Sequence, residues 1–375
     1  MIQGATVEAL SGTRRPGQPL LTIAIPTFNR QPFLAELLEC LLHQVQGLRD
    51  DLFELIVSDN CSTDNTGEVV AAFQQRGLPG RYIRNETNLG SDSNFLQCMD
   101  LAQGQYVWVL GDDDLLVPHA IATLLSLLSQ GEYDMVYLSS FGFRTDDGTE
   151  EGLLAGNLPT TRTRDRLGRI AEVVHEGQYF LEKVNALIGL ISVMIVNKNR
   201  LLATPHPAIE TLRDSNLMQI GWLFPLIHQK MTVLYVWERL LAYRSYNSGG
   251  WGVCEVFGER LDRIARQYFR DDIRLADALM NGVLRYWMCD AIMEMRRGRH
   301  AEMNAENFAA DIRHIFHDNW RYWVFVYPVA EFPMAVVEPL HSVLQITNKV
   351  TRAVQGGLRH LFSHGPYLRA GKATL

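Results

Sequence analysis

The sequence predicts an α/β protein in which helices cover both faces of a mostly parallel sheet, followed by a mainly helical C-terminal region. The sheet is predicted because, up to about residue 140, apolar runs typical of strands alternate with segments of helical period. Each apolar run also ends in a proline, a turn signal or a polar cluster. From Glu255 onward the apolar residues follow mainly a helical period, which predicts the C-terminal region.

Five segments of the first part read as strands. They are residues 20–27, 53–58, 81–84, 107–110 and 135–138. The segments between them carry helical patterns, namely residues 32–45, 66–73, 91–102 and 118–129. Because a helix follows each strand, neighbouring strands are expected to be parallel.

The chain is less regular after residue 140. Residues 144–166 are polar and predict an exposed loop. The apolar run 187–196 fits a strand by its Ile and Val content and a buried helix by its length. Residues 216–229 predict a helix, and 232–243 predict two short strands before a flexible loop at Asn247–Gly250.

Composition excludes several classes of protein. With 47% hydrophobic and 21% charged residues the chain is globular, and its net charge of −7 argues against a nucleic-acid partner. The five cysteines are odd in number and widely spaced, which fits a reducing compartment. The first 19 residues lack the apolar core of a secretory signal, and no apolar run is long enough to span a bilayer. We therefore expect a cytoplasmic protein that can associate with a membrane surface.

The strongest chemical signal is the cluster Asp112–Asp113–Asp114, which directly follows the apolar run 107–110. Open α/β sheets bind ligands at the C-terminal ends of their strands. In an extended segment Asp112 and Asp114 would point to the same side, where they could share one cation. Carboxylate oxygens suit Mg²⁺ or Mn²⁺. The alternative is that one Asp caps the next helix and the other two are solvated.

Four motifs at successive strand ends resemble those of the family-two glycosyltransferases of GT-A (Rossmann-like) fold. They are Pro26–Arg30, Asp59–Asp64, Asn88–Gly90 and Asp112–Asp114, the last matching the D-x-D motif of that family. The resemblance covers roughly residues 20–140. The amino-acid sequences of residues 56–65 and 110–116 are similar to those of the abequosyltransferase-like branch, which builds bacterial surface polysaccharides.

This resemblance implies a nucleotide-sugar site at the strand ends. The residues implied to bind substrate are Pro26, Thr27, Asn29, Arg30, Asp59, Asn88, Gly90 and Asp113. Among them, Asp59 would accept a hydrogen bond from the base. The alternative for Asp59 and Asp64 is turn and helix-cap chemistry, which we favour for Asp64.

The resemblance also implies a metal ion and a catalytic base. Asp114, with Asp112, would hold Mg²⁺ or Mn²⁺ against the diphosphate, where the ion stabilises the departing group. The base in this family is usually an acid of a Glu-Asp doublet about 90 residues later, and that doublet is missing here. Asp214 is the candidate base and Glu210 the alternative, although either fits a solvated charge. The missing doublet leaves an inverting or a retaining outcome open.

Two features later in the sequence each allow two interpretations. Residues 243–251 resemble a mobile segment that closes over the nucleotide, with Arg244 reaching a phosphate, and a surface hairpin fits as well. Aromatic residues crowd 320–332, and residues 341–375 contain five Lys and Arg but no acid. This pattern favours an anionic membrane surface, and it equally fits a packed helical subdomain or a contact in a homo-oligomer.

The predicted domains are an N-terminal extension (1–19), a GT-A catalytic domain (20–253) and a helical region with a basic tail (254–375). The predicted activity is transfer of a hexosyl or deoxyhexosyl group from a nucleotide sugar to a hydroxyl of a glycan, lipid-linked as in O-antigen biosynthesis. One alternative is a non-catalytic subunit that binds nucleotide sugars or assembles polysaccharide. A sugar nucleotidyltransferase is less favoured, because the Gly-rich segment Gly12–Arg14 precedes the first strand.

Overall fold

The computed structural model describes most of the chain. The described residues are 14–49, 51–143, 169–204, 212–227, 231–244, 252, 254–298, 308–362 and 367–369. The chain forms two compact units. The first combines residues 1–175, 190–245 and 366–375, and the second combines 176–189 and 246–365. In this division residues 176–189 lie with the helical unit and residues 366–375 with the first unit, whereas the predicted boundary was at residue 254.

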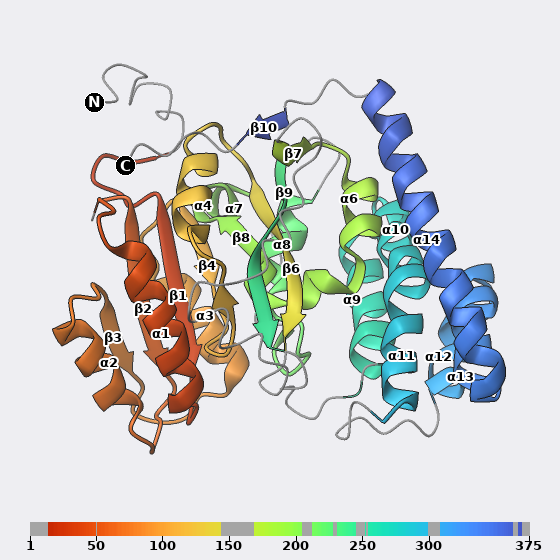
Figure 1. Cartoon of the computed structure of the whole chain (residues 1–375), viewed down its shortest axis with the longest axis horizontal. Coiled ribbons are helices and arrows are strands. Elements are labelled where there is room, and N and C mark those ends of the chain that lie inside the picture. Colours follow the sequence, from red (N-terminus) through yellow and green to blue (C-terminus); the bar gives the residue numbers. More distant parts are fainter. Residues whose placement is uncertain are drawn as a thin grey trace. The chain divides into compact units, whose positions relative to one another are not determined.

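The first unit contains a ten-stranded mixed sheet, shown in Figure 1. Its parallel part has the order β4-β1-β2-β3 and consists of β4 (Tyr106–Val109), β1 (Leu21–Thr27), β2 (Phe53–Asp59) and β3 (Arg81–Arg84). Every residue of β1 and β4 is buried, as expected for strands between two helical layers. The parallel part and its strand limits confirm the α/β prediction.

Helices cover both faces of the parallel strands. They are α1 (Gln31–Val45), α2 (Thr66–Gln75), α3 (Ser91–Leu101) and α4 (Ala120–Leu128). The crossovers through α1 and α2 run in one direction along the sheet, and the crossover through α3 runs back to β4. Because such crossovers are right-handed, α3 covers the opposite face. In agreement, α1 packs against α2 and α4, whereas α3 packs on β1, β2 and β4.

The remaining strands extend the sheet beyond β4. They are β5 (Leu115–Leu116), β6 (Met135–Phe143), β7 (Arg169–Val174), β8 (Met194–Asn197), β9 (Val233–Arg244) and β10 (Tyr367–Arg369). β8 is antiparallel to β4 and β6, and β9 is parallel to β6. The expected pair of strands at 232–243 is one strand with an irregularity: between Leu138 and Ser140 of β6, the partner residue in β9 changes from Val236 to Leu241.

Two apolar segments differ from simple expectations. The run 187–196 begins with the 3₁₀ turns η2 (Asn185–Gly189) and η3 (Ile191–Val193), and only its end joins β8. The described part of 216–229 forms the short helices α8 (Ile220–Leu223) and η5 (Phe224–Leu226), near the helix-breaking Pro225. Helix α7 (Lys198–Ala203) lies between these two segments. The loops predicted at 144–166 and 247–250 lie outside the described residues.

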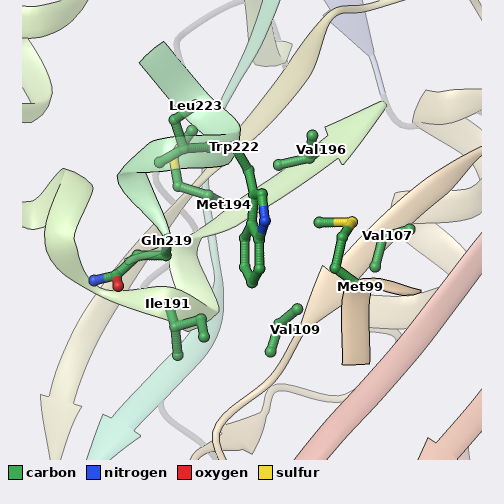
Figure 2. A pocket seen from close by; sticks show the side chains of 9 residues that line it. All are labelled: Met99, Val107, Val109, Ile191, Met194, Val196, Gln219, Trp222 and Leu223. Carbon is green, nitrogen blue, oxygen red and sulfur yellow. The ribbon is translucent and has the colours of Figure 1, made fainter. Parts of the chain in front are cut away.

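A small apolar cavity lies beside β4 in this unit, and Trp222 stands in its wall with Met99 and Val109 (Figure 2). Its volume of about 10 Å³ accommodates at most one water molecule. The buried indole N–H of Trp222 has no hydrogen-bond partner among the described residues. The cavity is too small for a sugar or a base, so it is a packing feature of the core.

The described elements of the second unit are all helical, which confirms the predicted C-terminal character. They are α6 (Gly177–Val184), η6 (Cys254–Arg260), α9 (Leu261–Tyr268), α10 (Ile273–Gly282), η7 (Val283–Trp287), α11 (Met288–Arg296), α12 (Phe308–Phe316), η8 (Tyr322–Val326), α13 (Tyr327–Glu331) and α14 (Met334–Phe362). A Cβ at Gly282 would lie 2.4 Å from the Glu182 carbonyl oxygen, so α10 and α6 touch through backbone. No described helix is long and apolar enough to cross a membrane.

Candidate active site

The three acids lie in a turn after β4, not in the extended segment that the sequence predicted. The turn is closed by a hydrogen bond from the Asp114 N–H to the Gly111 carbonyl oxygen (3.3 Å), and β5 follows it directly. Asp112 and Asp114 are buried, with 3% and 7% exposure, and Asp113 is half-buried. Because a turn rotates successive side chains, each acid has its own set of partners.

Asp112 and Asp113 are held by the end of β1 and the start of α1. The Thr27 hydroxyl donates to Asp112 Oδ2 at 2.7 Å. Arg30 lies between the two acids, with Nη1 3.2 Å from Asp112 Oδ1 and Nη2 2.8 Å from Asp113 Oδ2. The predicted substrate residues Thr27 and Arg30 are therefore direct neighbours of the acidic turn. Pro26 is buried next to them in β1, in register with Ser58 of β2.

Asp114 is held from the other side by β9 and the segment before β8. Its Oδ1 accepts from the Arg244 backbone N–H (3.1 Å), and its carboxylate also accepts from the Ser192 hydroxyl. Ser192 Oγ in turn accepts from the Gly111 N–H (2.9 Å). A Cβ at Gly111 would lie 3.2 Å from oxygens of Asp113, Asp114 and Ser192. Glycine at this position therefore lets the acids gather closely.

The Arg244 guanidinium is buried next to the same turn. It forms an ion pair with Glu36, donates from Nε to the Asp113 carbonyl oxygen (3.2 Å), and lies over the rings of Phe33 (4.8 Å) and Phe143 (4.7 Å). Arg244 is the last residue of β9. The rest of the segment predicted to close over the nucleotide, 245–251, lies outside the described residues.

This cluster carries excess negative charge. Asp112, Asp113, Asp114 and Glu36 face the guanidinium groups of Arg30 and Arg244, which leaves a formal charge of −2 among these side chains. Burial raises the pKa of Asp112 to about 7 despite its ion pair with Arg30. Burial and the Asp113 carboxylate also raise the pKa of Asp114. The hard oxygen ligands and the two excess negative charges suit a divalent cation, but Arg30 lies between Asp112 and Asp113, and the oxygens of the acidic turn are not gathered as closely as those of a formed metal site.

Asp59 lies at the end of β2 and is fully buried. Its Oδ1 accepts from the Ser62 N–H (2.8 Å), and its Oδ2 accepts from the Tyr82 hydroxyl (2.5 Å). Arg84 Nε lies 3.6 Å from the same Oδ2. In this arrangement Asp59 shapes the loop after β2. Its predicted contact with a base stays a prediction.

Asn29 connects the loops after β1 and β2. It adopts a left-handed backbone (φ 53°), which Asn tolerates better than most residues. Its N–H donates to Ser62 Oγ (2.9 Å), and its side-chain oxygen accepts from the Thr63 N–H (2.7 Å). Asp64 accepts from the N–H groups of Gln31 and Thr66, so it caps the first turns of α1 and α2 as we favoured.

The turn Asn88–Gly90 packs against the loop after β2 through Asn60. Asn60 Nδ2 donates to Asn88 Oδ1 (2.8 Å) and to the Gly90 carbonyl oxygen (3.1 Å), and its Oδ1 accepts from the Leu89 N–H (2.9 Å). Gly90 has φ 83°, a conformation that favours glycine. Asn88 and Gly90 are exposed. The structure thus connects the loops after β2 and β3, with Asn60 as the bridge.

Asp214, the candidate base, is exposed and has a left-handed backbone (φ 62°). Its backbone N–H donates to Asp92 Oδ2 (2.8 Å) at the start of α3. This contact places Asp214 near the turn that precedes α3. The alternative base, Glu210, lies outside the described residues.

The sequence analysis missed four residues that organise the site. Ser192 and Glu36 support the acidic turn, and Asn60 and Tyr82 support the loop after β2. Ser192 is the one hydroxyl residue inside the apolar run 187–196, which is a weak signal. Glu36 lies on α1, where an acidic residue by itself does not indicate a functional site. Only the fold brings these side chains to the motifs.

Comparison with known proteins is consistent with this geometry. Residues 22–187 match the model of Glycosyl transferase family 2. The chain is 40% identical over 110 residues to abequosyltransferase RfbV of Salmonella typhimurium, covering 29% of this chain and 32% of the relative. It is 35% identical over 114 residues to the GalNAc(5)-diNAcBac-PP-undecaprenol beta-1,3-glucosyltransferase of Campylobacter jejuni, covering 30% and 36%. The chain thus matches about a third of the length of these relatives.

Solved structures show the fold. TarS 1–349 of S. aureus aligns with a TM-score of 0.50 at 18% identity, covering 78% of this chain and 80% of that protein. The same protein in complex with UDP-GlcNAc aligns with a TM-score of 0.50 at 16% identity, covering 82% and 90%. Together with the motifs at the four strand ends, the family match leads to one conclusion: residues 22–187 of this chain are similar to glycosyl transferase family 2.

Proposed function

We propose that this protein is a glycosyltransferase that moves a hexosyl or deoxyhexosyl group from a nucleotide sugar to a hydroxyl of a glycan in bacterial surface-polysaccharide biosynthesis. The observation that carries the proposal is the buried acidic turn 112–114, which is tied to Thr27 and Arg30 inside the segment that matches the family. Such a turn at the strand ends is the position at which α/β sheets bind ligands.

The site residues would have different roles in the reaction. Asp114 and Asp112 would hold Mg²⁺ or Mn²⁺, which would neutralise the charge that develops on the departing nucleoside diphosphate. Thr27 and Arg30 fix Asp112, while Ser192 and the Arg244 backbone fix Asp114, so the carboxylates keep their positions. Such preorganised groups lose little free energy to rearrangement during the reaction.

The remaining predicted residues would bind the donor and activate the acceptor. The loops that carry Pro26, Asn29, Asp59, Asn88 and Gly90 would form the walls of the nucleotide pocket. Their cross-connections through Ser62 and Asn60 support this assignment, because they hold the three loops together. Asp214 would remove the proton from the acceptor hydroxyl.

We further propose a lipid-linked acceptor and a peripheral position on the cytoplasmic face of the membrane. Helix α14 turns polar residues toward α11 and η7, whereas its apolar residues Val336, Val343, Ile346 and Val350 are 51–62% exposed. The sequence 341–375 adds five positive charges and no acid, which is complementary to anionic lipids. One family relative is named for an undecaprenol-linked acceptor, which supports the same choice.

Donor binding is the first test. UDP-, dTDP-, GDP- and CDP-sugars would be titrated with Mn²⁺ and with EDTA, using thermal unfolding and calorimetry. We expect one nucleotide class to stabilise the protein only with Mn²⁺, by about 2.7 kcal/mol at 100 times its Kd. Asp114→Ala should abolish this effect, whereas Asp100→Ala, at an exposed position of α3, should not. Absence of binding by every nucleotide would contradict the proposal.

A second candidate is a non-catalytic subunit that binds nucleotide sugars, and the missing Glu-Asp doublet favours it. Transfer to an isolated lipid-linked glycan separates the two, because a binding subunit would bind the donor without turnover.

Sedimentation with phosphatidylglycerol vesicles tests the membrane proposal. Ile346→Glu should release the protein from vesicles, and Ser342→Glu, at an exposed polar position of the same helix, should not.

A further inference from the structure

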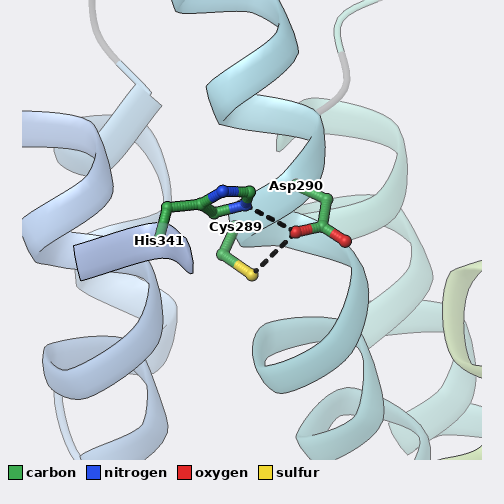
Figure 3. Close-up of side chains that lie close together, drawn as sticks. All are labelled: Cys289, Asp290 and His341. Atoms are coloured by element: carbon green, nitrogen blue, oxygen red, sulfur yellow. Dashed lines mark hydrogen bonds and ion pairs between the residues drawn. The ribbon is translucent and has the colours of Figure 1, made fainter. Parts of the chain in front are cut away.

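Three metal-ligating side chains meet in the helical unit. Cys289 and Asp290 are consecutive on α11, and His341 comes from α14 (Figure 3). Their ligand atoms all lie within 4.8 Å of one another, and this is the one such group of His, Cys, Asp and Glu among the described residues. None of the three belongs to the candidate active site.

All three groups converge on one carboxylate oxygen. Asp290 Oδ1 lies 2.7 Å from His341 Nε2 and 3.5 Å from Cys289 Sγ, and it also accepts from the Gln345 amide. The Cys289 S–H has a second acceptor, the Arg285 carbonyl oxygen at 3.7 Å, so the hydrogen bonds to Asp290 Oδ1 stay within the capacity of its two lone pairs. The sulfur, the nitrogen and the oxygen still converge on one point, where a cation would meet a lone pair of each atom.

The burial of the group suits a bound ion. Cys289 is 2% exposed and His341 is 8% exposed, whereas the Asp290 side chain is 41% exposed. The sulfur and nitrogen are therefore shielded from bulk water, while the Asp290 side remains open for entry of an ion. Figure 3 shows the two helices facing each other across the group, so a bound ion would connect α11 and α14.

The ligand types select the metal. A thiolate, an imidazole and a carboxylate form a mixed sulfur, nitrogen and oxygen set, which zinc accepts in tetrahedral geometry. Zinc–ligand bonds of about 2.0–2.3 Å place neighbouring ligand atoms roughly 3.3–3.8 Å apart. The nitrogen–oxygen pair at 2.7 Å and the sulfur–oxygen pair at 3.5 Å need only side-chain adjustments to reach this spacing.

We propose that Cys289, Asp290 and His341 form a zinc site that fastens α14 to α11. The thiol proton is released to solvent as the sulfur–zinc bond forms, so the thiolate and the carboxylate balance the two positive charges of the ion. Gln345, one helical turn after His341, presents its amide at the same position and can supply its oxygen as the fourth ligand, because amide O and N are interchangeable by rotation.

The site would give α14 a defined anchor. Apart from this group, α14 buries Val337 and Leu344, and it contacts η7 through polar pairs in which Arg285 donates to Asn348 Oδ1 (3.1 Å) and Thr351 Oγ1 (3.1 Å). Such half-exposed hydrogen bonds contribute modestly to stability. A structural zinc ion contributes folding free energy directly. The zinc ion would then add to the contacts that already hold the proposed membrane-facing helix against α11 and η7.

Cobalt titration tests the site without any activity measurement. The full chain is freed of metal with a chelator and titrated with Co²⁺, which gives a sulfur-to-cobalt charge-transfer band only when a thiolate is bound. We expect one equivalent of Co²⁺ to produce the band and one equivalent of Zn²⁺ to remove it. The band should be lost in Cys289→Ser and persist in Cys254→Ser, a buried cysteine of the same unit.

Two further variants keep the test decisive. His341→Gln and Asp290→Asn retain the thiol, and each should weaken Co²⁺ binding at least about tenfold even if Cys289→Ser does not fold. Asp114→Ala should leave the band unchanged, so failure here is separate from failure of the donor site. A wild-type protein without the band, or a band of equal strength in Cys289→Ser, would overturn the proposal and leave a hydrogen-bonded cluster.

Discussion

Replacing Asp112 with asparagine tests whether its buried carboxylate destabilises the metal-free fold. Burial raises the pKa of Asp112 from 3.8 to about 7, although the ion pair with Arg30 opposes the shift. The folded protein therefore keeps this proton up to about pH 7, whereas the unfolded chain releases it near pH 4. Because the unfolded state binds fewer protons in this window, stability falls as the pH rises through it and stays low above pH 7.

The magnitude follows from the two pKa values. One pKa unit corresponds to about 1.4 kcal/mol, so ionisation lowers the free energy of unfolding by roughly 4 kcal/mol at pH 8 and roughly 2 kcal/mol at pH 5. Asparagine resembles the protonated acid and can still bond to Thr27 and Arg30. We therefore expect Asp112→Asn to be more stable than the wild type in EDTA, by up to these amounts.

Urea unfolding at pH 5 and pH 8 measures the effect, with EDTA or Mn²⁺ present. Mn²⁺ should stabilise the wild type alone and reverse the order at pH 8. Asp64→Asn is the matched control: burial would raise the pKa of Asp64, but hydrogen bonds from Thr66 and Gln31 outweigh it and lower the pKa, so this variant should lose stability. An Asp112→Asn protein less stable than the wild type at both pH values in EDTA would refute the reasoning.

Three further substitutions test other parts of the site. Gly111→Ala places a Cβ 3.2 Å from Ser192 Oγ and from two carboxylates, so Mn²⁺ affinity measured by calorimetry should fall at least about tenfold. Asp214→Asn should lower kcat by about 10²–10⁴ with unchanged donor affinity, and an unchanged kcat would exclude it as the base. Tyr82→Phe leaves Asp59 Oδ2 without its hydroxyl donor and should cost roughly 1–3 kcal/mol in urea unfolding.

The parallel part of the sheet could be predicted because its signals are local. β1 and β4 are mainly apolar runs, β1 reaches Thr27 and β4 stops just before the acidic turn, and helices of regular period separate the strands. The segment 187–196 gave no such signal. Apart from Gly189 and Ser192 its residues are apolar at buried and half-buried positions alike, so neither a period of two nor one of 3.6 results. Its 3₁₀ turns depend on tertiary packing.

The acidic turn could be predicted from the sequence because its residue types indicate one kind of chemistry. Three consecutive acids after a buried strand indicate a cation site, so Asp112–Asp114 stood out. The sequence did not indicate their arrangement, because the turn depends on Gly111 lying beside Ser192, which is 81 residues later in the chain. Arg30 was predicted to bind substrate, but the sequence did not indicate that it lies between Asp112 and Asp113 and pairs with both.

Arg244 shows why motifs alone do not define this site. It lies outside the family match, 130 residues after Asp114, and it holds that acid through its backbone N–H, a contact that any residue except proline could make. Its guanidinium, the part a sequence can reveal, is buried between two aromatic rings and paired with Glu36. To reach a phosphate it would have to leave Glu36 and expose both charges. We infer that Arg244 positions Asp114 and balances the charge of the turn, a role set by the end of β9.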